Sequence, residues 1–535
     1  MRVPPGIRKR DFETALTQWQ KVTGDQWVFS SEDDVDLYKD AYSPFRNEAD
    51  EIIAAAAVAP ASVGEVQEVM RVANRYRIPM YPVSTGRNLG YGGSAPVLSG
   101  SVVLDLKRMN RVLDVNERNA SALVEPGVSY FDLYRHIREL GYRLWIDAPA
   151  PGWGSLIGNA LDHGAGYTAN PHRDHFDSHC GLEVVLANGD LVRTGMGALP
   201  GAETWQQFKY GYGPLVDGLF AQSNFGVVTK MGFWLYPEPE AYFDATVSVP
   251  RFNDVIPFVD TLANLIYSGV LNSNTIMGSP MRYSTLDNPE INELFLNTDN
   301  PAAVQDLDRY AASNSLPFWD NRLKFYGPED VIRAQWEYAK RMFSSIPGVQ
   351  FTDGKLLRFP LSDEQIAALP DKENVGVPSL AAFRDGARSE HNPTPTLGHI
   401  GFSPVIPMTG EAVIESQRVI ARAMVDIGTV PAFNTLPNSY HTRNFVILIG
   451  FSIMDDTNIN QKSREVFRSL IKLAAEHGWG EYRTHTAFMD DVADVYSFND
   501  HALRRLHETL KDAIDPNGIL AAGRYGIWPK HLRKS

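Results

Sequence analysis

Cysteine is almost absent from this chain of 535 residues, in which Cys180 is the only one. A single thiol cannot form an internal disulfide, and it indicates a reducing compartment. Long apolar runs are missing too, since no stretch approaches the roughly 18 consecutive apolar residues of a membrane span. The N-terminal segment is basic but continues into further charged residues instead of an apolar core, so no export signal is expected. We therefore expect a cytoplasmic protein.

The chain also lacks an excess of positive charge. It has 50 basic and 64 acidic residues, which leave a net charge of -14. This balance disfavours nucleic acids and anionic membranes as partners and favours a small molecule. Hydrophobic residues make up 44% of the chain and aromatic residues 11%, as in a globular protein. The length predicts two or three domains, with enough apolar material for a buried site.

Several common catalytic motifs are missing. There is no G-x-S-x-G and no catalytic-cysteine signature, which disfavours a hydrolase. There is no H-E-x-x-H, and His172, His175 and His179 belong to a polar segment, so we expect no metal site. Neither common nucleotide loop is present, because no G-K-[ST] occurs and no G-x-G-x-x-G opens a helix.

A glycine-rich loop is present at residues 82–93, which read P-V-S-T-G-R-N-L-G-Y-G-G. Glycines tolerate positive φ and let backbone N–H groups converge on an anion. The apolar residues 78–83 before the loop and 101–106 after it are each typical of a strand. The sequence therefore predicts a phosphate-binding loop that joins strand to strand.

The surrounding pattern predicts an α+β fold. Residues 53–60 indicate a buried strand, and Ser62 with Glu65 predicts a capping box at the start of a helix. Strands and helices follow without strict alternation, which favours α+β over a doubly wound sheet. Further strands are expected at 120–125 and 182–187, further helices at 130–140 and 328–343, and a domain boundary at the proline-rich residues 236–240.

Four other segments leave their roles open. Residues 151–159 (P-G-W-G-S-L-I-G-N) imitate a dinucleotide fingerprint weakly, because prolines precede them where a buried strand is needed. Residues 223–230 favour a structural turn into a strand. Tyr482 and His485 belong to Y-R-T-H, and on a strand they would face opposite sides. His399 lies between glycine and apolar residues, so on its own it favours a core histidine over a functional one.

Taken together, these segments resemble the vanillyl-alcohol oxidase / p-cresol methylhydroxylase family of flavoproteins, and within it the eugenol oxidase branch of 4-alkylphenol oxidases. The resemblance extends from about residue 5 to 528, is densest over 55–235 and is thinner over 242–385. The motifs that carry it are S-T-G-R-N-L-G-Y-G-G, L-V-E-P-G-V-S-Y-F-D-L-Y, G-W-G-S-L-I-G-N, L-E-V-V-L-A-N-G-D-L-V-R-T-G-M-G-A-L-P-G, Q-S-N-F-G-V-V-T-K-M-G-F-W-L, G-H-I-G-F-S-P and E-Y-R-T-H-T-A-F-M-D-D.

This resemblance implies a fold and a cofactor. Residues 1–237 would form an FAD-binding domain of the p-cresol methylhydroxylase (PCMH) type, residues 238–494 an inserted α+β cap domain, and residues 495–535 a C-terminal return to the FAD domain. The FAD pyrophosphate would lie against the glycine loop, and other residues would line the rest of the cofactor. The loop residues are Ser84, Thr85, Gly86, Arg87, Asn88, Leu89 and Gly90, and the others are Ser155, Asn159, Val228 and Arg524.

His399 matches the histidine that bonds covalently to the flavin 8-methyl group in the oxidases of this family. Under the resemblance it is therefore a cofactor residue and not a core histidine. The methylhydroxylases instead attach the flavin through a tyrosine a few residues upstream. Residues 383–398 contain no tyrosine, and His391 is the nearest counterpart there.

The resemblance also implies an activity. Tyr91, Tyr482 and Arg483 match residues that bind a phenol as its phenolate, and Tyr167 and His441 match residues near the substrate. Hydride would pass from the benzylic carbon of a 4-alkylphenol, 4-allylphenol or 4-hydroxybenzylic alcohol to flavin N5, giving a p-quinone methide. Oxygen would then be reduced to H₂O₂.

A second acceptor is compatible with the same chemistry. The alternative is a flavoprotein subunit that passes electrons to a c-type cytochrome. His399 and the expected lack of an export signal favour the oxidase. Members of the family form homodimers and sometimes larger assemblies, so the same is expected here.

One residue departs from the family pattern. Ala150 stands where the alcohol oxidases carry an aspartate near flavin N5, and Asp147 matches a different family aspartate. We hypothesise that Ala150 enlarges the pocket near the benzylic carbon and slows steps that need a base. Ala432 and Asn434 also replace larger or more apolar residues, which points to an altered substrate range.

Overall fold

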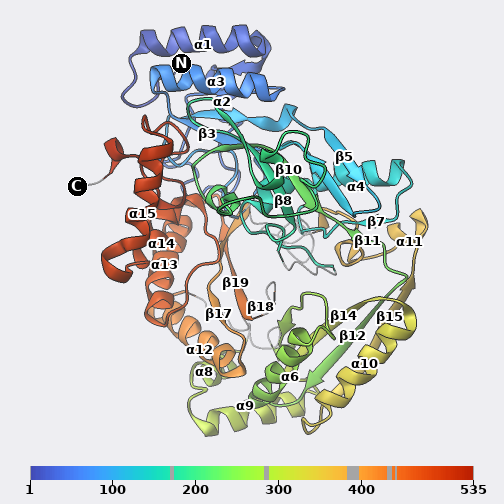
Figure 1. Ribbon diagram of the computed structural model, residues 1–535. Helices are drawn as coiled ribbons and strands as arrows, with labels where there is room; N and C mark the ends of the chain where they lie inside the picture. The colour runs from blue at the N-terminus through green and yellow to red at the C-terminus, as the bar shows by residue number, and fades with distance from the viewer. Residues whose placement is uncertain are drawn as a thin grey trace.

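The protein consists of two lobes joined by several chain crossings, seen in the computed structural model of Figure 1. The structure describes residues 2–88, 90–168, 174–281, 288–381, 397–429, 436–439 and 443–533. Helices and strands are mixed along the chain, and the α+β fold class is confirmed.

The first sheet of the upper lobe carries the glycine loop. Its strand order is β1-β2-β4-β3, with β2, β4 and β3 parallel and β1 antiparallel at the edge. The glycine loop connects β3 to β4, so the expected strand-to-strand connection is confirmed. The strands are β1 Val28–Phe29, β2 Ala56–Val58, β3 Met80–Val83 and β4 Val102–Asp105.

A second sheet of the upper lobe is antiparallel throughout, with the order β5-β6-β10-β8-β9. A short ribbon of β7 and β11 leads from it toward the lower lobe. The strands are β5 Val112–Asn116, β6 Ser121–Val124, β7 Leu144–Trp145, β8 His179–Val185, β9 Leu191–Arg193, β10 Val227–Trp234 and β11 Tyr236–Pro237.

The lower lobe contains two further antiparallel sheets. One has the order β13-β14-β12-β15, and in the other β19 pairs with β16, β17 and β18. The strands are β12 Ala241–Val249, β13 Met277–Gly278, β14 Trp319–Gly327, β15 Gln350–Arg358, β16 Gly398–Phe402, β17 Val405–Pro407, β18 Leu436–Asn438 and β19 Asn444–Ile453.

Amphipathic helices cover these sheets and close the cores. α1 and α3 lie at the top of Figure 1, and α6 and α10 pack on the lower lobe, where the rings of Phe258 and Phe343 are 5.0 Å apart. The longer helices are α1 Lys9–Thr23, α3 Val63–Tyr76, α4 Tyr130–Glu139, α6 Val255–Tyr267, α8 Pro289–Leu296, α9 Pro301–Ser313, α10 Glu329–Phe343, α12 Gly410–Asp426, α13 Thr457–Glu476 and α15 Phe498–Ile514. The shorter ones are α2 Glu32–Asp36, α5 Leu156–Ala160, α11 Asp363–Ala367 and α14 Met489–Val495.

The C-terminal segment returns to the first sheet. The amide of Met80 donates to the carbonyl of Ile519 at 2.7 Å, and the amide of Ala521 donates to the carbonyl of Met80 at 2.7 Å. The buried ammonium of Lys511 donates to the carbonyls of Asn224 and Leu520. These contacts bring Arg524, three residues after Ala521, beside Tyr81 of strand β3.

The expected start of α3 is correct in position and differs in detail. Ser62 caps the helix, and its hydroxyl accepts from the amide of Glu65 at 3.2 Å. The carboxylate of Glu65 accepts instead from the amide of Ala61 at 2.8 Å, so the reciprocal half of the expected box is one residue out of place.

Among the described helices, none is long and apolar enough to cross a membrane.

Candidate active site

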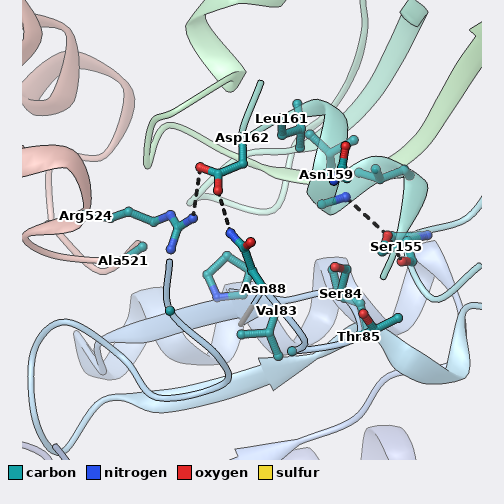
Figure 2. Close-up of a pocket in the computed structure, with 18 of the residues that line it drawn as sticks. Val83, Ser84, Thr85, Asn88, Ser155, Asn159, Leu161, Asp162, Ala521 and Arg524 are labelled. Atoms are coloured by element: carbon teal, nitrogen blue, oxygen red, sulfur yellow. Dashed lines mark hydrogen bonds and ion pairs between the residues drawn. The ribbon is translucent and has the colours of Figure 1, made fainter. Parts of the chain in front are cut away.

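A cavity lies between the glycine loop, helix α5, strand β10 and the C-terminal return (Figure 2). Strand β3 ends at Val83, so the loop begins where backbone N–H groups are released from the ladder. Its lining includes most of the cofactor residues expected from the sequence: Ser84, Thr85, Gly86, Arg87, Asn88, Ser155, Asn159, Val228 and Arg524. Leu89 lies outside the described residues.

Two glycines show how closely the backbone is drawn together here. A Cβ at Gly158 on helix α5 would come within 2.5 Å of the Ser84 hydroxyl, so the helix can approach the loop only without a side chain. Gly90 has φ +89°, a left-handed conformation that favours glycine. Both ends of the loop therefore depend on glycine for their geometry.

Helix α5 begins after its N-cap residue, Ser155, whose hydroxyl anchors the start of the helix. The hydroxyl of Ser155 donates to the carbonyl of Pro126 at 2.6 Å and accepts from the amide of Gly158 at 3.2 Å. This cap fixes Ser155 at the cavity wall, and Asn159 follows one turn later (Figure 2). The sequence prediction placed both residues at the cofactor, and the structure puts both on the cavity wall.

The cavity is bordered by two cations. Arg524 donates from Nη1 to the hydroxyl of Tyr81 at 2.5 Å. Burial alone would lower the pKa of Arg524, but the neighbouring Tyr81 and Asp162 raise it, so the guanidinium stays charged. Arg87 lies over the ring of Trp153 at 5.0 Å. A cavity lined by a glycine loop and two guanidinium groups suits a ligand with negative charge.

His399 lies beside the far end of the glycine loop. A Cβ at Gly90 would be 3.1 Å from its Nε2, and the amide of Gly401 donates to the carbonyl of Gly90 at 3.3 Å. The ring packs at 5.4 Å from that of Tyr42, yet the residue keeps one exposed side. Burial of the other side lowers the pKa of His399, which favours the neutral imidazole. The core-histidine interpretation therefore fails, because the ring faces the loop and is not enclosed.

Three residues predicted to bind the phenol come together beside this loop. The guanidinium carbon of Arg483 lies 4.0 Å from the ring centre of Tyr91 and 5.1 Å from that of Tyr482. Burial raises the pKa of Tyr482, although Arg483 partly opposes that effect, so its hydroxyl stays protonated. The trio thus offers one cation and two hydroxyl groups.

Each hydroxyl of this trio is oriented by a neighbour. The hydroxyl of Tyr91 lies 2.8 Å from Oγ of Ser403, which is completely buried. The hydroxyl of Tyr482 donates to the carbonyl of His163. Ser403 also holds the backbone of Tyr482, because the carbonyl of Ser403 accepts a hydrogen bond from the amide of Tyr482 at 2.9 Å.

Two more predicted residues, Tyr167 and Ala150, lie close to each other, and a third, His441, lies outside the described residues. The amide of Tyr167 donates to the carbonyl of Ala148 at 3.2 Å, so Tyr167 is close to the segment that contains the half-buried Ala150. The carbonyl of Tyr167 accepts from Lys324 of strand β14 at 2.5 Å. His441 is not among the described residues.

Other histidines serve structural pairs. His175 lies 3.1 Å from Asp147, and His179 lies 3.3 Å from Asp217. Nε2 of His485 lies 2.7 Å from Oδ2 of Asp40, and His485 belongs to a loop and not to the strand considered above. His172 lies outside the described residues, and within the rest no group of three or more metal-ligating side chains occurs.

The sequence prediction missed three residues of this site: Asp162, Ser403 and Lys324. Asp162 and Ser403 lie in or next to motifs that carried the resemblance, so a polar residue inside those motifs was the available signal. Lys324 lies in the weakly matched part of the chain and offered none. Burial lowers its pKa to about 7, and it donates to Asn274 at 3.0 Å and Asn374 at 3.3 Å as well as to Tyr167.

Two family models match this chain. One is described as FAD binding domain and covers residues 54–195, which include the glycine loop and helix α5. The other is described as FAD linked oxidases, C-terminal domain, and covers residues 441–525, which include Tyr482, Arg483 and Arg524.

Three relatives match over nearly their whole length. The 4-cresol dehydrogenase [hydroxylating] flavoprotein subunit of Pseudomonas putida is 33% identical, over 98% of this chain and 97% of its own. The structure of 4-ethylphenol oxidase from Gulosibacter chungangensis, in an isoeugenol complex, is 34% identical with a TM-score of 0.83, over 99% and 100%. The structure of p-cresol methylhydroxylase with substrate bound is 30% identical with a TM-score of 0.81, over 99% of each chain.

The cavity suits the cofactor that these matches imply. A dinucleotide pyrophosphate needs convergent N–H groups, glycines at the points of close approach and nearby cations. The loop, Gly158 and the two arginines supply all three. The chain is thus an FAD-dependent oxidoreductase that belongs to the vanillyl-alcohol oxidase / p-cresol methylhydroxylase family.

Proposed function

We propose that this protein is an oxidase of para-substituted phenols: 4-alkylphenols, 4-allylphenols and 4-hydroxybenzylic alcohols. The observation that carries the proposal is the convergence of Tyr91, Tyr482 and Arg483 beside the cofactor cavity. The relatives named for 4-cresol and 4-ethylphenol support the same substrate class.

The trio has the chemistry to bind a phenol as its anion. A free phenol has a pKa of about 10, and a hydrogen bond to a charged group contributes about 1.5–3 kcal/mol. One pKa unit corresponds to about 1.4 kcal/mol, so two such contacts, which the guanidinium of Arg483 has enough N–H groups to donate, lower the pKa of a bound phenol by roughly 3 units. That shift is enough to ionise the phenol near neutral pH. The para phenolate then pushes electrons toward the benzylic carbon and makes it a hydride donor.

Bound FAD would supply the hydride acceptor of the reaction, and O₂ would take up the two electrons to give H₂O₂. Residues 84–90 would hold its pyrophosphate, and Ser155, Asn159, Val228 and Arg524 would line the rest. We further propose that residues 238–494 form the cap over this site, between the FAD-binding residues 1–237 and the return at 495–535. The β7–β11 ribbon and the pairing of Met80 with the C-terminal segment support that division.

His399 would carry FAD covalently. Its imidazole is favoured in the neutral form by burial, and only that form has a free nitrogen lone pair for bond formation. The contact of its Nε2 with the Gly90 position puts it at the end of the loop that would hold the cofactor.

Ala150 would set what happens after hydride transfer. The quinone methide can gain water to give an alcohol or lose a proton to give an alkenylphenol. Water addition benefits from a general base, which alanine cannot supply. We therefore expect proton loss to compete well with water addition. Because alanine is also smaller than aspartate, we expect bulky para substituents to be accepted.

The alternative is a dehydrogenase that passes electrons to a c-type cytochrome. The observation in its favour is the 33% identity with the 4-cresol dehydrogenase flavoprotein subunit over nearly the whole chain. The 34% identity with 4-ethylphenol oxidase favours O₂ to a similar degree. His399, which matches the linkage of the oxidases, decides our choice.

Stopped-flow reduction and oxygen consumption test the proposal directly. 4-Ethylphenol, 4-allylphenol and 4-hydroxybenzyl alcohol should bleach the flavin without oxygen and yield H₂O₂ with it. Reduction by these phenols followed by reoxidation only with added cytochrome c would establish the alternative. Failure of every phenol to bleach the flavin would reject both.

Acid precipitation tests the covalent bond. Yellow colour should stay in the pellet of the wild-type protein, disappear in His399→Ala and persist in the matched control His391→Ala. Colour that persists in His399→Ala and is lost in His391→Ala would reassign the linkage.

A further inference from the structure

Asp162 is a buried carboxylate at the junction of the two sites. It follows helix α5, where its amide donates to the carbonyl of Asn159 at 3.2 Å. Only 3% of the residue is exposed, and its side chain lines the same cavity as the glycine loop. Figure 2 shows the carboxylate between Asn88 of the loop and Arg524 of the C-terminal return.

Three partners surround this carboxylate, and each comes from a different part of the chain. Oδ2 accepts from Nδ2 of Asn88 at 2.5 Å and lies 3.7 Å from Nη1 of Arg483. Oδ1 lies 3.9 Å from Nη2 of Arg524. Asp162 therefore links the glycine loop, the phenol-binding trio and the C-terminal return through one carboxylate.

The charges explain why an acid belongs there. Arg483 and Arg524 are both largely buried, with side chains 16% and 25% exposed. Two guanidinium groups on either side of one point repel each other, and a carboxylate between them offsets that repulsion. At 3.7 Å the attraction to Arg483 works without a short hydrogen bond, so Asp162 holds the guanidinium without drawing it away from Tyr91 and Tyr482.

We propose that Asp162 is a positioning residue that holds Arg483 at the phenolate site and fixes it relative to the glycine loop through Asn88. This inference rests on the proposed function, because it assumes that Arg483 receives the phenolate. It goes further than the proposed function because it assigns a role to Asp162, which is not among the proposed phenol-binding residues. That role is to fix the position of the phenolate site relative to the glycine loop.

A positioning role and a purely electrostatic role of Asp162 predict opposite changes in the affinity for a phenolate. Asp162→Asn keeps the shape and removes the negative charge. If Asp162 acted only through its charge, this change would favour a nearby phenolate and tighten its binding. If Asp162 positions Arg483, the guanidinium is no longer held and phenolate binding weakens.

The probe is 4-bromophenol, which has no benzylic hydrogen and so cannot be turned over. Ultraviolet difference spectra of the FAD-loaded protein report both its binding and the fraction bound as phenolate. We expect Asp162→Asn to raise the Kd about tenfold and to move ionisation of the bound probe to higher pH. Asp217→Asn is the matched control: it removes another buried carboxylate, one that pairs with His179 and Thr194, and should leave both readouts unchanged.

A double-mutant cycle separates positioning from general damage. Because Asp162 acts through Arg483, Asp162→Asn should weaken binding little further in an Arg483→Ala background, whereas damage elsewhere would add to it. Unchanged or tighter binding in Asp162→Asn, with Arg483→Ala weakened, would overturn the inference and leave the proposed function standing. Unchanged binding in Arg483→Ala would instead reject the proposed phenolate site itself.

A second variant covers the case in which Asp162→Asn yields no FAD-loaded protein. Asn88→Ala removes the hydrogen bond that holds the carboxylate and leaves every charge in place. With FAD content verified, it should raise the Kd of 4-bromophenol about threefold. An affinity equal to that of the wild type would contradict the inference.

Discussion

The hydroxyl of Tyr91, at the exit of the glycine loop, lies 2.8 Å from the hydroxyl of Ser403, which follows strand β16. Ser403 also donates its amide to the carboxylate of Glu481 at 3.1 Å and accepts from the amide of Tyr482. One buried serine therefore links the two tyrosines of the proposed phenolate site.

Ser403→Ala should raise the KM for phenols and leave the amount of bound FAD unchanged. A net hydrogen bond contributes about 0.5–1.5 kcal/mol, so we expect a change of roughly 2- to 12-fold. Steady-state kinetics with 4-ethylphenol give the value. The control is Ser452, an exposed residue of strand β19 that lies opposite His399 of strand β16. Ser452→Ala should keep the wild-type KM. Equal KM values for the two variants would show that Ser403 does not orient Tyr91.

Gly90→Ala should impair attachment of the flavin. The added methyl group would lie 3.1 Å from Nε2 of His399, and φ +89° costs a non-glycine residue about 1–2 kcal/mol. Fluorescence of the acid-washed protein on a denaturing gel measures the attached fraction, which should fall at least several-fold.

Gly141→Ala provides the control for backbone strain alone. Gly141 has φ +71° and open space around its Cβ position, so this variant adds strain without a contact to His399. Its attached fraction should equal that of the wild type. A similar loss in both variants would mean that strain, and not the contact, explains the result at Gly90.

The sequence could predict the parts of the fold that rest on local patterns. Ser62 caps α3 because its hydroxyl accepts from an amide three residues on, and that relation is contained in four residues. The glycine loop between strands was predictable for the same reason. The side-by-side placement of Met80 and Ile519 was not, because it depends on how segments more than 400 residues apart meet. Only the resemblance to a known family supplied that return.

The residues of the candidate site also divide into those that could be predicted from the sequence and those that could not. Tyr482 and Arg483 are neighbours in sequence, but nothing local brings Tyr91 to within 4.0 Å of the guanidinium. The motif match supplied that group as well. The residues that position it, Ser403 and Asp162, were not predicted, because their roles come from contacts with partners that are distant in the chain. Glu65 shows that even a local motif is predicted only in part, since its carboxylate accepts a hydrogen bond from the amide of Ala61 and not from that of Ser62.

Ala150→Asp should change the products more than the rate of flavin reduction. A general base near the benzylic carbon speeds water addition, and such groups contribute about 10²- to 10⁴-fold where they are well placed. We expect the ratio of alcohol to alkenylphenol from 4-ethylphenol to rise several-fold, as measured by chromatography. Ala150→Asn has nearly the same size without a base and should leave the ratio close to that of the wild type. Unchanged product ratios in Ala150→Asp would refute the hypothesis that the missing base controls partitioning.

Lys324 should make the stability of the protein depend on pH. Burial lowers its pKa to about 7, whereas a lysine in the unfolded chain has a pKa of about 10.4. Between these values the unfolded chain binds a proton that the folded protein does not. The free energy of unfolding therefore rises with pH, by at most about 1.4 kcal/mol per unit.

Replacing Lys324 with methionine removes this dependence. Lys324→Met should be less stable overall, because the carbonyl of Tyr167 and the side chain of Asn274 lose their donor. The Tm of the wild type should nevertheless rise relative to that of the variant as the pH increases from about 7 to about 9. Lys355→Met, at an exposed position on β15 of the same sheet, should follow the wild-type curve. If the curves of wild type and Lys324→Met instead ran parallel over this range, Lys324 would have to keep its proton, and its three hydrogen bonds would hold a charged ammonium.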